Sequence, residues 1–127
     1  MEKTVLIIDE TAAWRERYCS ELEAEGFHVL TAADSKEAIA YLENIKFDLI
    51  ISELETPVGS GFENLNEYVK MRDDLKLVIT STHPELKNDF RTWIADAFII
   101  KSDDLTDLKT TIKYLLFDEE RLHQRLN

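Results

Sequence analysis

Residues 47–61 read FDLIISELETPVGSG. The stretch begins with an apolar run over 47–52 and ends abruptly in an acid, Glu53, before a loop that contains Pro57 and two glycines. A short, continuous apolar run is typical of a strand buried on both faces of a parallel sheet. A carboxylate at the end of such a strand lies at the rim of the sheet, so the role of Glu53 decides how the protein is interpreted.

The same alternation of apolar runs and helical periodicity repeats along the whole chain. Strands are predicted at 5–8, 27–32, 47–52, 75–81 and 97–101, and helices at 11–26, 34–46, 62–74, 83–96 and 102–127. This order predicts an α/β fold, in which a parallel sheet carries helices on both faces. No linker-like segment interrupts it, so we expect a single domain over 1–127, with 119–127 extending the last helix.

Residue types at the helix ends support these boundaries. Gly26 is a natural stop for the first helix, because glycine readily adopts the left-handed conformation found there. Asp34 or Ser35 can cap the second helix, and Ser102 or Asp103 the last one.

Charge and composition exclude several classes of function. The net charge is −11, which argues against nucleic-acid binding by this domain, because such binding requires a basic surface. No stretch reaches the about 20 apolar residues of a membrane span, and the N-terminal pattern is not that of a signal peptide. We therefore expect a cytoplasmic protein without a membrane partner. The single cysteine, Cys19, allows no internal disulfide and lies in a helical pattern, which favours a packing or surface role.

Chemically useful residues follow four of the five predicted strands. Asp9 and Glu10 follow the first, Glu53 the third, hydroxyl residues including Ser81 end the fourth, and Lys101 ends the fifth. Ligands of open parallel α/β sheets bind outside the carboxyl ends of the strands. Three carboxylates at one rim repel one another unless a cation lies among them, and Mg²⁺ and Lys101 are the natural candidates. A single acid after a strand is also typical of a helix cap, but the joint occurrence favours a site.

Five separated segments carry a family resemblance. They are VLIIDE (5–10), EAEGFHV (23–29), FDLIISELETPVGSGFE (47–63), LVITST (77–82) and ADAFIIKS (95–102). Over residues 3 to 117 the chain resembles the receiver domain of two-component response regulators, and the offsets of Pro57 and Gly61 from position 53 fit the family pattern. The resemblance implies a flavodoxin-like, three-layer, doubly wound (βα)5 sandwich with a parallel sheet of order 2-1-3-4-5.

The resemblance also implies a role for each residue at the rim. By position, Asp9 and Glu10 match the acidic pair that holds Mg²⁺, and Glu53 stands at the phosphoacceptor position, where it also counts among the metal ligands. Ser81 matches the hydroxyl that contacts the phosphoryl group, and Lys101 the lysine that bonds one of its oxygens. Positioning and charge neutralisation are the tasks of such a site, because phosphoryl transfer passes through a highly charged transition state.

The expected output of the switch follows from the same resemblance. Phe98 matches the aromatic residue whose rotamer reports the switch, and Thr82 stands beside the phosphoryl group, where the family commonly has alanine. The expected partner is a sensor histidine kinase or another signalling protein. The surface formed by 83–96, 97–101 and the last helix reads out the change and is a candidate for contact in a homodimer.

The main departure from the family is glutamate in place of aspartate at position 53. The extra methylene shifts the carboxylate by about 1.5 Å, and in-line attack and Mg²⁺ coordination are both sensitive to such a shift. Glu53 either imitates a phosphorylated aspartate or leaves the site inert to phosphate. We favour a pseudo-receiver, a protein-binding module that is not an enzyme and whose Mg²⁺ site is weakened or lost. The alternative is a working Mg²⁺-dependent receiver that is phosphorylated on Glu53 or elsewhere.

Smaller features complete the expectations. Compared with the family pattern, Glu10 stands where aspartate is commoner, and Ser102 stands where proline is usual. Glu55 is expected in a solvated loop. Trp93 fits either a partner surface or the core. The leucines of the last helix, Leu122 and Leu126 among them, fit either a solvated end or a helix that continues into a dimer or an output domain. A flavodoxin-like cofactor binder is disfavoured, since no glycine-rich loop follows the first strand.

Overall fold

A computed structural model describes residues 2–55 and 61–118, and a five-stranded parallel sheet forms its centre. The strands are β1 (Thr4–Ile8), β2 (His28–Ala32), β3 (Leu49–Glu53), β4 (Lys76–Ser81) and β5 (Ala97–Ile100). Their order is β2-β1-β3-β4-β5, and all four pairings are parallel. The expected fold class and strand order are therefore confirmed.

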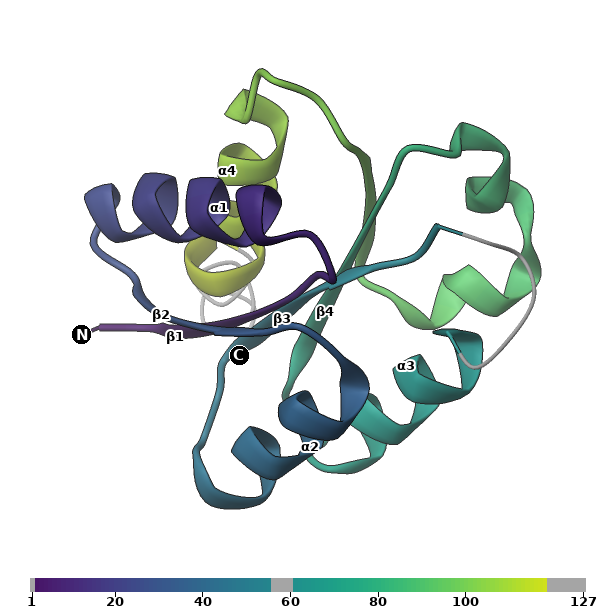
Figure 1. Cartoon of the computed structure of the whole chain (residues 1–127), viewed down its shortest axis with the longest axis horizontal. Helices are drawn as coiled ribbons and strands as arrows, with labels where there is room; N and C mark the ends of the chain where they lie inside the picture. Colours follow the sequence, from purple (N-terminus) through teal and green to yellow (C-terminus); the bar gives the residue numbers. More distant parts are fainter. Residues whose placement is uncertain (1, 56–60, 119–127) are drawn as a thin grey trace.

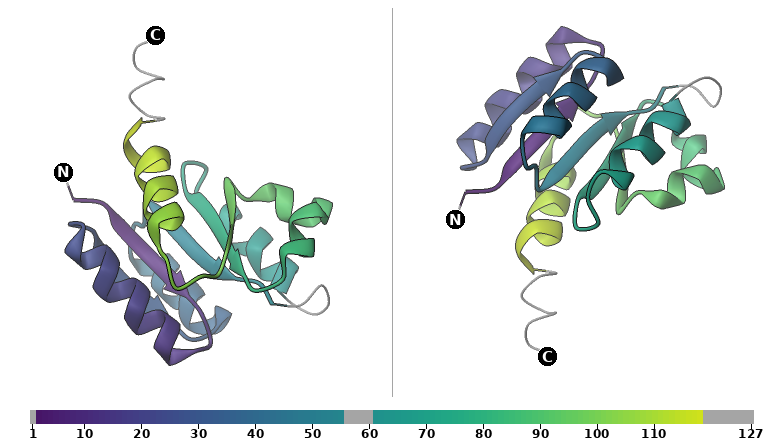
Figure 2. Two further views of the ribbon diagram at one scale, coloured as in Figure 1. Left: turned by 90° about the horizontal axis from the view of Figure 1, so that it is seen from above. Right: turned by 90° about the horizontal axis from the view of Figure 1, so that it is seen from below.

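Helices cover both faces of the sheet (Figures 1 and 2). The α-helices are α1 (Ala12–Ala24), α2 (Ser35–Asn44), α3 (Gly61–Lys70) and α4 (Thr106–Lys113), and α4 continues into a π-helical turn, η3 (Tyr114–Asp118). Figure 1 shows α1 and α4 on one face and α2 and α3 on the other. Two short 3-10 helices, η1 (Pro84–Asn88) and η2 (Phe90–Ile94), connect β4 to β5.

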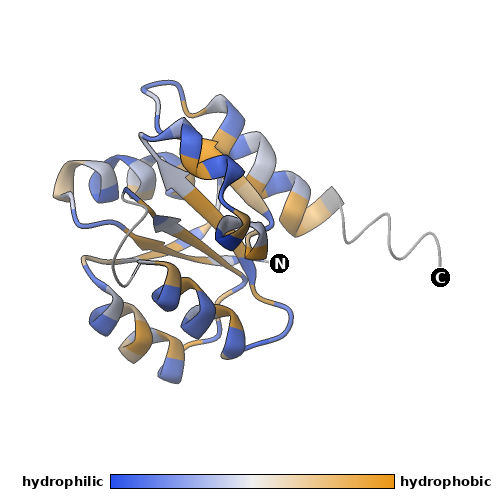
Figure 3. Ribbon diagram, turned by 90° about the vertical axis from the view of Figure 1, so that its right-hand side faces the viewer, coloured by the Kyte–Doolittle hydropathy of each residue, from blue (hydrophilic) through white to orange (hydrophobic). Residues whose placement is uncertain are grey.

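The core consists of two apolar layers, one on each face of the sheet. Side chains of a strand alternate between its faces, so Val5 and Ile7 pack with α1 and α4, whereas Leu6 and Ile8 pack with α2 and α3. These four side chains are at most 7% exposed. The hydropathy colouring in Figure 3 shows apolar strands enclosed by helices whose outer sides are polar. Burial on both faces explains why the strands read as continuous apolar runs.

The predicted ends of the first two helices are confirmed, but the predicted start of the last helix is wrong. Gly26 has φ +97° just after α1, and the Asp34 side chain accepts a hydrogen bond from Glu37 N–H at 2.9 Å. The last helix begins at Thr106, so neither Ser102 nor Asp103 caps it. Asp104 accepts instead from Thr106 N–H at 2.9 Å, which keeps 102–105 outside the helix.

The prediction of a single helix over 83–96 is also wrong, because Asp89 divides this segment into η1 and η2. Asp89 has an extended backbone (φ −78°, ψ 121°), and its carboxylate accepts a hydrogen bond from Arg91 N–H at 3.0 Å. Such a local bond competes with a continuous helix. The buried Thr92 hydroxyl then joins the two turns by donating to the carbonyl oxygens of Asp89 (2.8 Å) and Leu86 (3.3 Å).

Some sequence features lie outside the described residues, namely Pro57, Leu122, Leu126 and the extension over 119–127. Within 2–55 and 61–118, none of the helices combines the length and the apolar character that a membrane crossing requires. The single-domain interpretation of 1–127 stays a prediction.

We predict that Gly26→Ala lowers the free energy of unfolding by about 1–2 kcal/mol, because an L-residue is strained at positive φ. The new methyl group would meet no atom within 4 Å, so the effect isolates backbone strain from steric overlap. Urea denaturation measures the change. Gly26→Asn serves as the control and should cost less, since asparagine tolerates this conformation. Equal stability of Gly26→Ala and the wild type would contradict the prediction.

Candidate functional site

The parallel register brings the residues at the carboxyl ends of β1, β3 and β5 to one rim of the sheet. Glu53 pairs with Thr80 at the end of β3 and β4, and Asp9 directly follows β1. Lys101 directly follows β5, where its backbone N–H donates to the Ser81 carbonyl oxygen at 2.8 Å. The backbone therefore fixes where these side chains begin, and their convergence follows from the strand order 2-1-3-4-5.

The Lys101 ammonium lies at the centre of the site and contacts three carboxylates. Its Nζ is 2.5 Å from Glu53 Oε2, 2.9 Å from Asp9 Oδ2 and 3.5 Å from Glu55 Oε1. The Lys101 side chain is 3% exposed, compared with 1% for Asp9, 14% for Glu53 and 30% for Glu55. One buried positive charge is therefore shared among three acids of increasing exposure.

Two aromatic side chains of α1 lie next to this ammonium group. The Trp14 ring centroid is 5.2 Å from Lys101 Nζ, within the range of a cation–π contact. Tyr18 packs 5.3 Å from Trp14, measured between ring centroids, and is almost completely buried. Burial raises the pKa of Tyr18 to about 12, so its hydroxyl remains neutral beside the acids. The aromatic pair thus excludes water from one side of Lys101.

The charge balance shifts the pKa values of both members of the central ion pair. Burial alone would lower the pKa of Lys101, but the contacts with Glu53 and Asp9 raise it overall. The pKa of Glu53 is also raised, first by burial and then by the charge of Asp9, which together outweigh the attraction of Lys101. One ammonium cannot fully compensate the charges of two carboxylates, and the raised pKa of Glu53 is the result.

The other residues expected at the site occupy more distant positions. Glu10 has an exposed side chain, and it is its backbone N–H that donates to Glu53 Oε1, at 3.3 Å. The Ser81 side chain is fully buried, and its hydroxyl oxygen accepts from His83 N–H at 3.0 Å. Phe98 is half-buried against the core layer of α2 and α3. Asp9, Glu53 and Lys101 are thus brought into contact, whereas the roles of Glu10, Ser81 and Phe98 stay predictions.

Glu55 lies in the loop after β3, as expected, but its side chain is only 30% exposed and belongs to the site. Its carboxylate accepts hydrogen bonds from the backbone N–H of Thr82, at 3.2 Å to Oε1, and from the Thr82 hydroxyl. Glu55 thereby joins the end of β3 to the segment that follows β4 and approaches Lys101. Spacing could have indicated this, because residues two apart in an extended chain share a face, as Glu53 and Glu55 do.

The arrangement of the acids does not fit a divalent cation. Lys101 Nζ lies between the carboxylates of Asp9 and Glu53, in the place where a shared cation would be bound. In the part of the chain that the structure describes, no three Asp, Glu, His or Cys side chains are grouped so that they could hold a metal ion. Mg²⁺ prefers near-octahedral oxygen coordination, which requires open space among the acids. Lys101 fills that space, so these carboxylates as arranged here leave no room for the ion.

A pocket of about 270 Å³ opens beside Asp9 and Glu53. Its wall includes the exposed Glu10 and residues of α2 and α3, among them Asn64 and the buried Tyr68. This pocket is the solvent access to the carboxylates from the α2–α3 side of the sheet.

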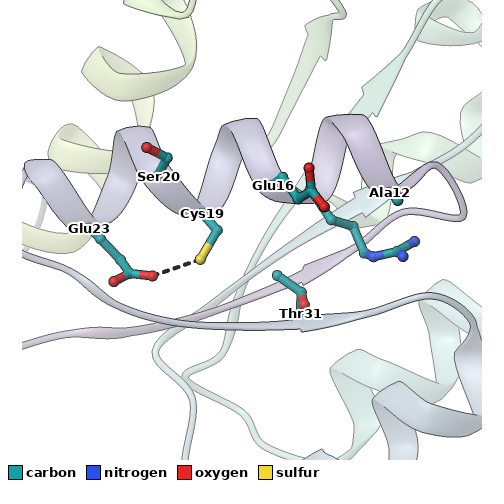
Figure 4. A pocket seen from close by; sticks show the side chains of 7 residues that line it. Ala12, Glu16, Cys19, Ser20, Glu23 and Thr31 are labelled. Atoms are coloured by element: carbon teal, nitrogen blue, oxygen red, sulfur yellow. Dashed lines mark hydrogen bonds between the residues drawn. The ribbon is translucent and has the colours of Figure 1, made fainter.

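A larger pocket, of about 560 Å³, lies between α1 and β2 (Figure 4). Neither Asp9 nor Glu53 lines it. Cys19 lines it and donates a hydrogen bond to Glu23 Oε1 at 2.7 Å. Burial and this bond raise the pKa of Cys19 to about 11, so it remains a thiol near neutral pH. A neutral thiol is a poor nucleophile, which agrees with the expected packing or surface role.

Comparisons with known proteins give a consistent result. The family model described as "Response regulator receiver domain" matches residues 5–113. Response regulator RR06 of Streptococcus pneumoniae serotype 2 (strain D39 / NCTC 7466) is 27% identical over 114 residues, which cover 88% of this chain and 52% of that protein. The chain thus spans about half the length of this relative.

Solved structures with similar folds include receiver proteins from two further organisms. A response regulator receiver domain protein (CheY-like) from Methanospirillum hungatei JF-1 has a TM-score of 0.85 and 31% identity, and the match covers 95% of this chain and 98% of that one. TrrA from Thermotoga maritima, in complex with Mg(2+)-BeF, has a TM-score of 0.82 and 32% identity, with 90% and 99% covered. TrrA in complex with the histidine kinase ThkA gives 0.81 and 32%, with 90% and 98% covered.

We predict that Lys101→Met lowers the free energy of unfolding by about 3–5 kcal/mol at neutral pH, because it leaves Asp9 and Glu53 buried without a counter-charge. The loss should shrink near pH 4, around the ordinary carboxyl pKa. Without Lys101 the folded-state pKa of Glu53 rises further above its unfolded value, so stability is present at low pH and lost as the pH rises. Urea denaturation across this range measures the effect.

Lys109→Met is the matched control, since Lys109 forms a partly exposed ion pair with Glu21 at 2.6 Å. Such pairs contribute at most about 1 kcal/mol. If Lys101→Met lowered the free energy of unfolding as little as Lys109→Met does, the central role of Lys101 between Asp9 and Glu53 would be contradicted.

Proposed function

The chain belongs to the response regulator receiver domain family of two-component signalling, and we propose that it is a pseudo-receiver, a signalling and protein-binding module that works without phosphorylation. The observation that carries the proposal is the Lys101–Glu53 contact of 2.5 Å. It joins the residue at the acceptor position to the only buried ammonium at the rim among the described residues. A nucleophile held in this way is not free to attack a phosphoryl donor.

The length of the Glu53 side chain supports the proposal. Glu53 is the last residue of β3, and its carboxylate extends far enough to accept from Glu10 N–H as well as from Lys101. Bonds to both its oxygens restrain the carboxylate, whereas a productive in-line attack needs a geometry accurate to less than about 1 Å. Receiver domains are signalling modules in general, so what remains in this chain is binding.

The weak fit to Mg²⁺ is a second support. The TrrA structure carries Mg(2+)-BeF, and receiver domains of this family typically bind Mg²⁺. In this chain Lys101 lies between Asp9 and Glu53, and the Glu10 side chain is exposed. We therefore propose that Mg²⁺ binding is weakened or lost, and with it the main means of neutralising an incoming phosphoryl group.

The proposed partner is a sensor histidine kinase or another signalling protein. The support is the similarity to TrrA, which has been solved in complex with the histidine kinase ThkA. Because the chain spans only part of its curated relatives, the identity of any output domain is part of the same proposal. Binding without phosphoryl transfer would let the domain compete with working receivers for such a kinase.

The proposed surface for homodimer contact is formed by η2 and β5 with neighbouring α4. Phe90 is 73% exposed, Trp93 71%, Ile94 38% and Ile100 42%. These exposed large apolar side chains come from two neighbouring stretches of the chain, η2 and β5, and exposed apolar surface typically marks a protein interface. The exposure of Trp93 favours its interpretation as a surface residue over a place in the core.

The alternative is a working receiver, in which Glu53 or another residue accepts a phosphoryl group with the help of Mg²⁺. The pocket beside Asp9 and Glu53 gives solvent access to these carboxylates, which is what this alternative requires. It also requires that Lys101 release Glu53, which breaks the shortest of the three contacts of Lys101 with a carboxylate. The covalent state of the protein separates the two functions.

We predict that the wild type gains no mass after incubation with Mg²⁺ and acetyl phosphate, whereas Glu53→Asp gains one phosphoryl group. The shorter side chain withdraws the carboxylate from Lys101 by about 1.5 Å and restores room for a donor. Intact-mass spectrometry measures the outcome. Glu67→Asp, an exposed substitution on α3, is the control and should gain nothing.

A phosphoryl group on the wild-type protein would overturn the pseudo-receiver proposal. Absence of phosphorylation in both proteins would show that restoring aspartate is not enough. The departures at Thr82, Ser102 or the metal site would then also have to be reversed.

We also predict that the wild type dimerises in a concentration-dependent manner and that a Phe90→Ser/Trp93→Ser double variant stays monomeric. Both side chains are more than two-thirds exposed, so their replacement should leave the fold intact. Sedimentation velocity over a range of concentrations measures the association. Ile45→Ser, at the end of α2 and 36% exposed, is the matched control. A monomeric wild type, or a double variant that still dimerises, would refute contact through this face.

A further inference from the structure

The strand β2 forms one edge of the sheet. Within residues 2–55 and 61–118 it pairs with β1 alone, so one side of its backbone carries no neighbouring strand. The His28 N–H donates to the Lys3 carbonyl oxygen at 2.9 Å, and the Ala32 carbonyl oxygen accepts from Asp9 N–H at 3.1 Å. The first and the last residue of β2 therefore turn their backbone groups toward β1 and its flanks.

The backbone groups on the open side of this edge belong to Val29 and Thr31. Backbone groups alternate along a strand, and those of His28 and Ala32 face β1, so the N–H and C=O groups of Val29 and Thr31 point outward. Such a row of groups is a template for an added strand, and natural edges are often protected by lysine or proline. The β2 sequence, HVLTA, contains neither residue, so the edge is open to pairing.

A pocket accompanies this edge on the α1 side of the sheet. It has a volume of about 560 Å³, and Thr31 lines it from β2. Side chains two apart in a strand share a face, and Val29 accordingly packs with the core layer of α1 and α4. Figure 4 shows Cys19 and Glu23 pointing from α1 toward the strand that carries Thr31. A strand added beside β2 would therefore place every second side chain next to this pocket.

The charges on α1 decide which side chain the pocket favours. Glu16 and Glu23 line it and are exposed. Arg15 also lines it, but its Nη1 donates to the Asp9 carbonyl oxygen at 2.7 Å, which holds the guanidinium at the end of the pocket nearest the rim. Glu23 accepts from the Cys19 thiol at 2.7 Å, and a thiol is a weak donor that an ammonium or guanidinium group can displace. The pocket therefore favours a cationic side chain.

We infer that the edge of β2 and the pocket beside it bind an extended, basic segment of another protein by strand addition. Backbone hydrogen bonds to Val29 and Thr31 hold the segment, and lysine or arginine at alternate positions reaches Glu16 and Glu23. None of the three carboxylates that contact Lys101 lines the pocket. This surface is therefore separate from the rim, and the inference holds whether or not the wild type accepts a phosphoryl group.

A second copy of this chain fits the edge less well than a basic segment does. Its β2 would bring Val29 and Thr31 to the pocket, and neither carries a positive charge. Antiparallel pairing of two β2 strands would also place both α1 helices on the same face of one continuous sheet. The acids Glu16 and Glu23 of both copies would then face one another, and such like charges oppose association.

The test uses the synthetic peptide acetyl-TVKVKVT-amide, whose two lysines share one face when the peptide is extended. One control peptide has glutamate in place of both lysines. The other keeps the lysines but is methylated on every backbone nitrogen between the terminal threonines, which removes the donors needed for strand pairing. Hydrogen exchange followed in ¹H–¹⁵N spectra reports the edge directly. In the free protein we expect rapid exchange at the Val29 and Thr31 amides and slow exchange at Leu30, which faces β1.

We expect the lysine peptide to bind with a dissociation constant of about 0.1–1 mM and to slow exchange at the two outward amides. Neither control peptide should do so. Glu16→Gln/Glu23→Gln should weaken binding about fivefold, because two partly exposed ion pairs are lost. Glu63→Gln/Glu67→Gln is the matched control, since it removes two exposed acids from α3 and should leave binding unchanged.

Three results would overturn the inference. Equal weakening in both double variants would show attraction to the overall negative charge only. Binding of the methylated peptide as tight as that of the lysine peptide would exclude strand addition. Slow exchange at the two outward amides of the free protein, increasing with its concentration, would identify a second copy of the chain as the occupant of the edge.

Discussion

The buried ammonium of Lys101 is the interaction on which the rim of the sheet depends. The strand order brings the ends of β1, β3 and β5 together, and two of these ends carry carboxylates. The positive charge of Lys101 lies 2.5 Å from Glu53 Oε2 and 2.9 Å from Asp9 Oδ2, and it offsets the repulsion between these two carboxylates. The aromatic pair of α1 strengthens this dependence, because Trp14 and Tyr18 exclude the solvent that would otherwise screen the charges.

The sequence was sufficient to predict the fold and the centre of the site. Continuous apolar runs identify strands buried on both faces, and the rule that ligands bind at the carboxyl ends of strands brings Asp9, Glu53 and Lys101 together. The failures have local and long-range causes. Asp89 divides the predicted helix by a side-chain bond that periodicity does not record. The place of Glu55 depends on Thr82, which is 27 residues away in the chain.

Membership of a family and the chemistry of one chain are separate conclusions. The matched model covers most of the chain and establishes a receiver domain, and similarity to TrrA extends to its fold. Neither comparison determines what glutamate does at position 53. The proposal for Glu53 rests instead on the contacts, in which both oxygens of Glu53 are already bonded and Glu55 adds a further acid to the same rim.

The division of 84–94 into two 3-10 turns has a consequence for how the surface around Trp93 can change shape. Short 3-10 turns have poorer hydrogen-bond geometry than an α-helix of the same length, and they lack the cooperativity that makes a helix unfold as a unit. The Thr92 hydroxyl links the turns through its bonds to the carbonyl oxygens of Asp89 and Leu86. The backbone of this connection is therefore less strongly held than that of one continuous helix, and Leu86, which is 3% exposed and packed in the core, and the buried Thr92 are what anchor it to the domain.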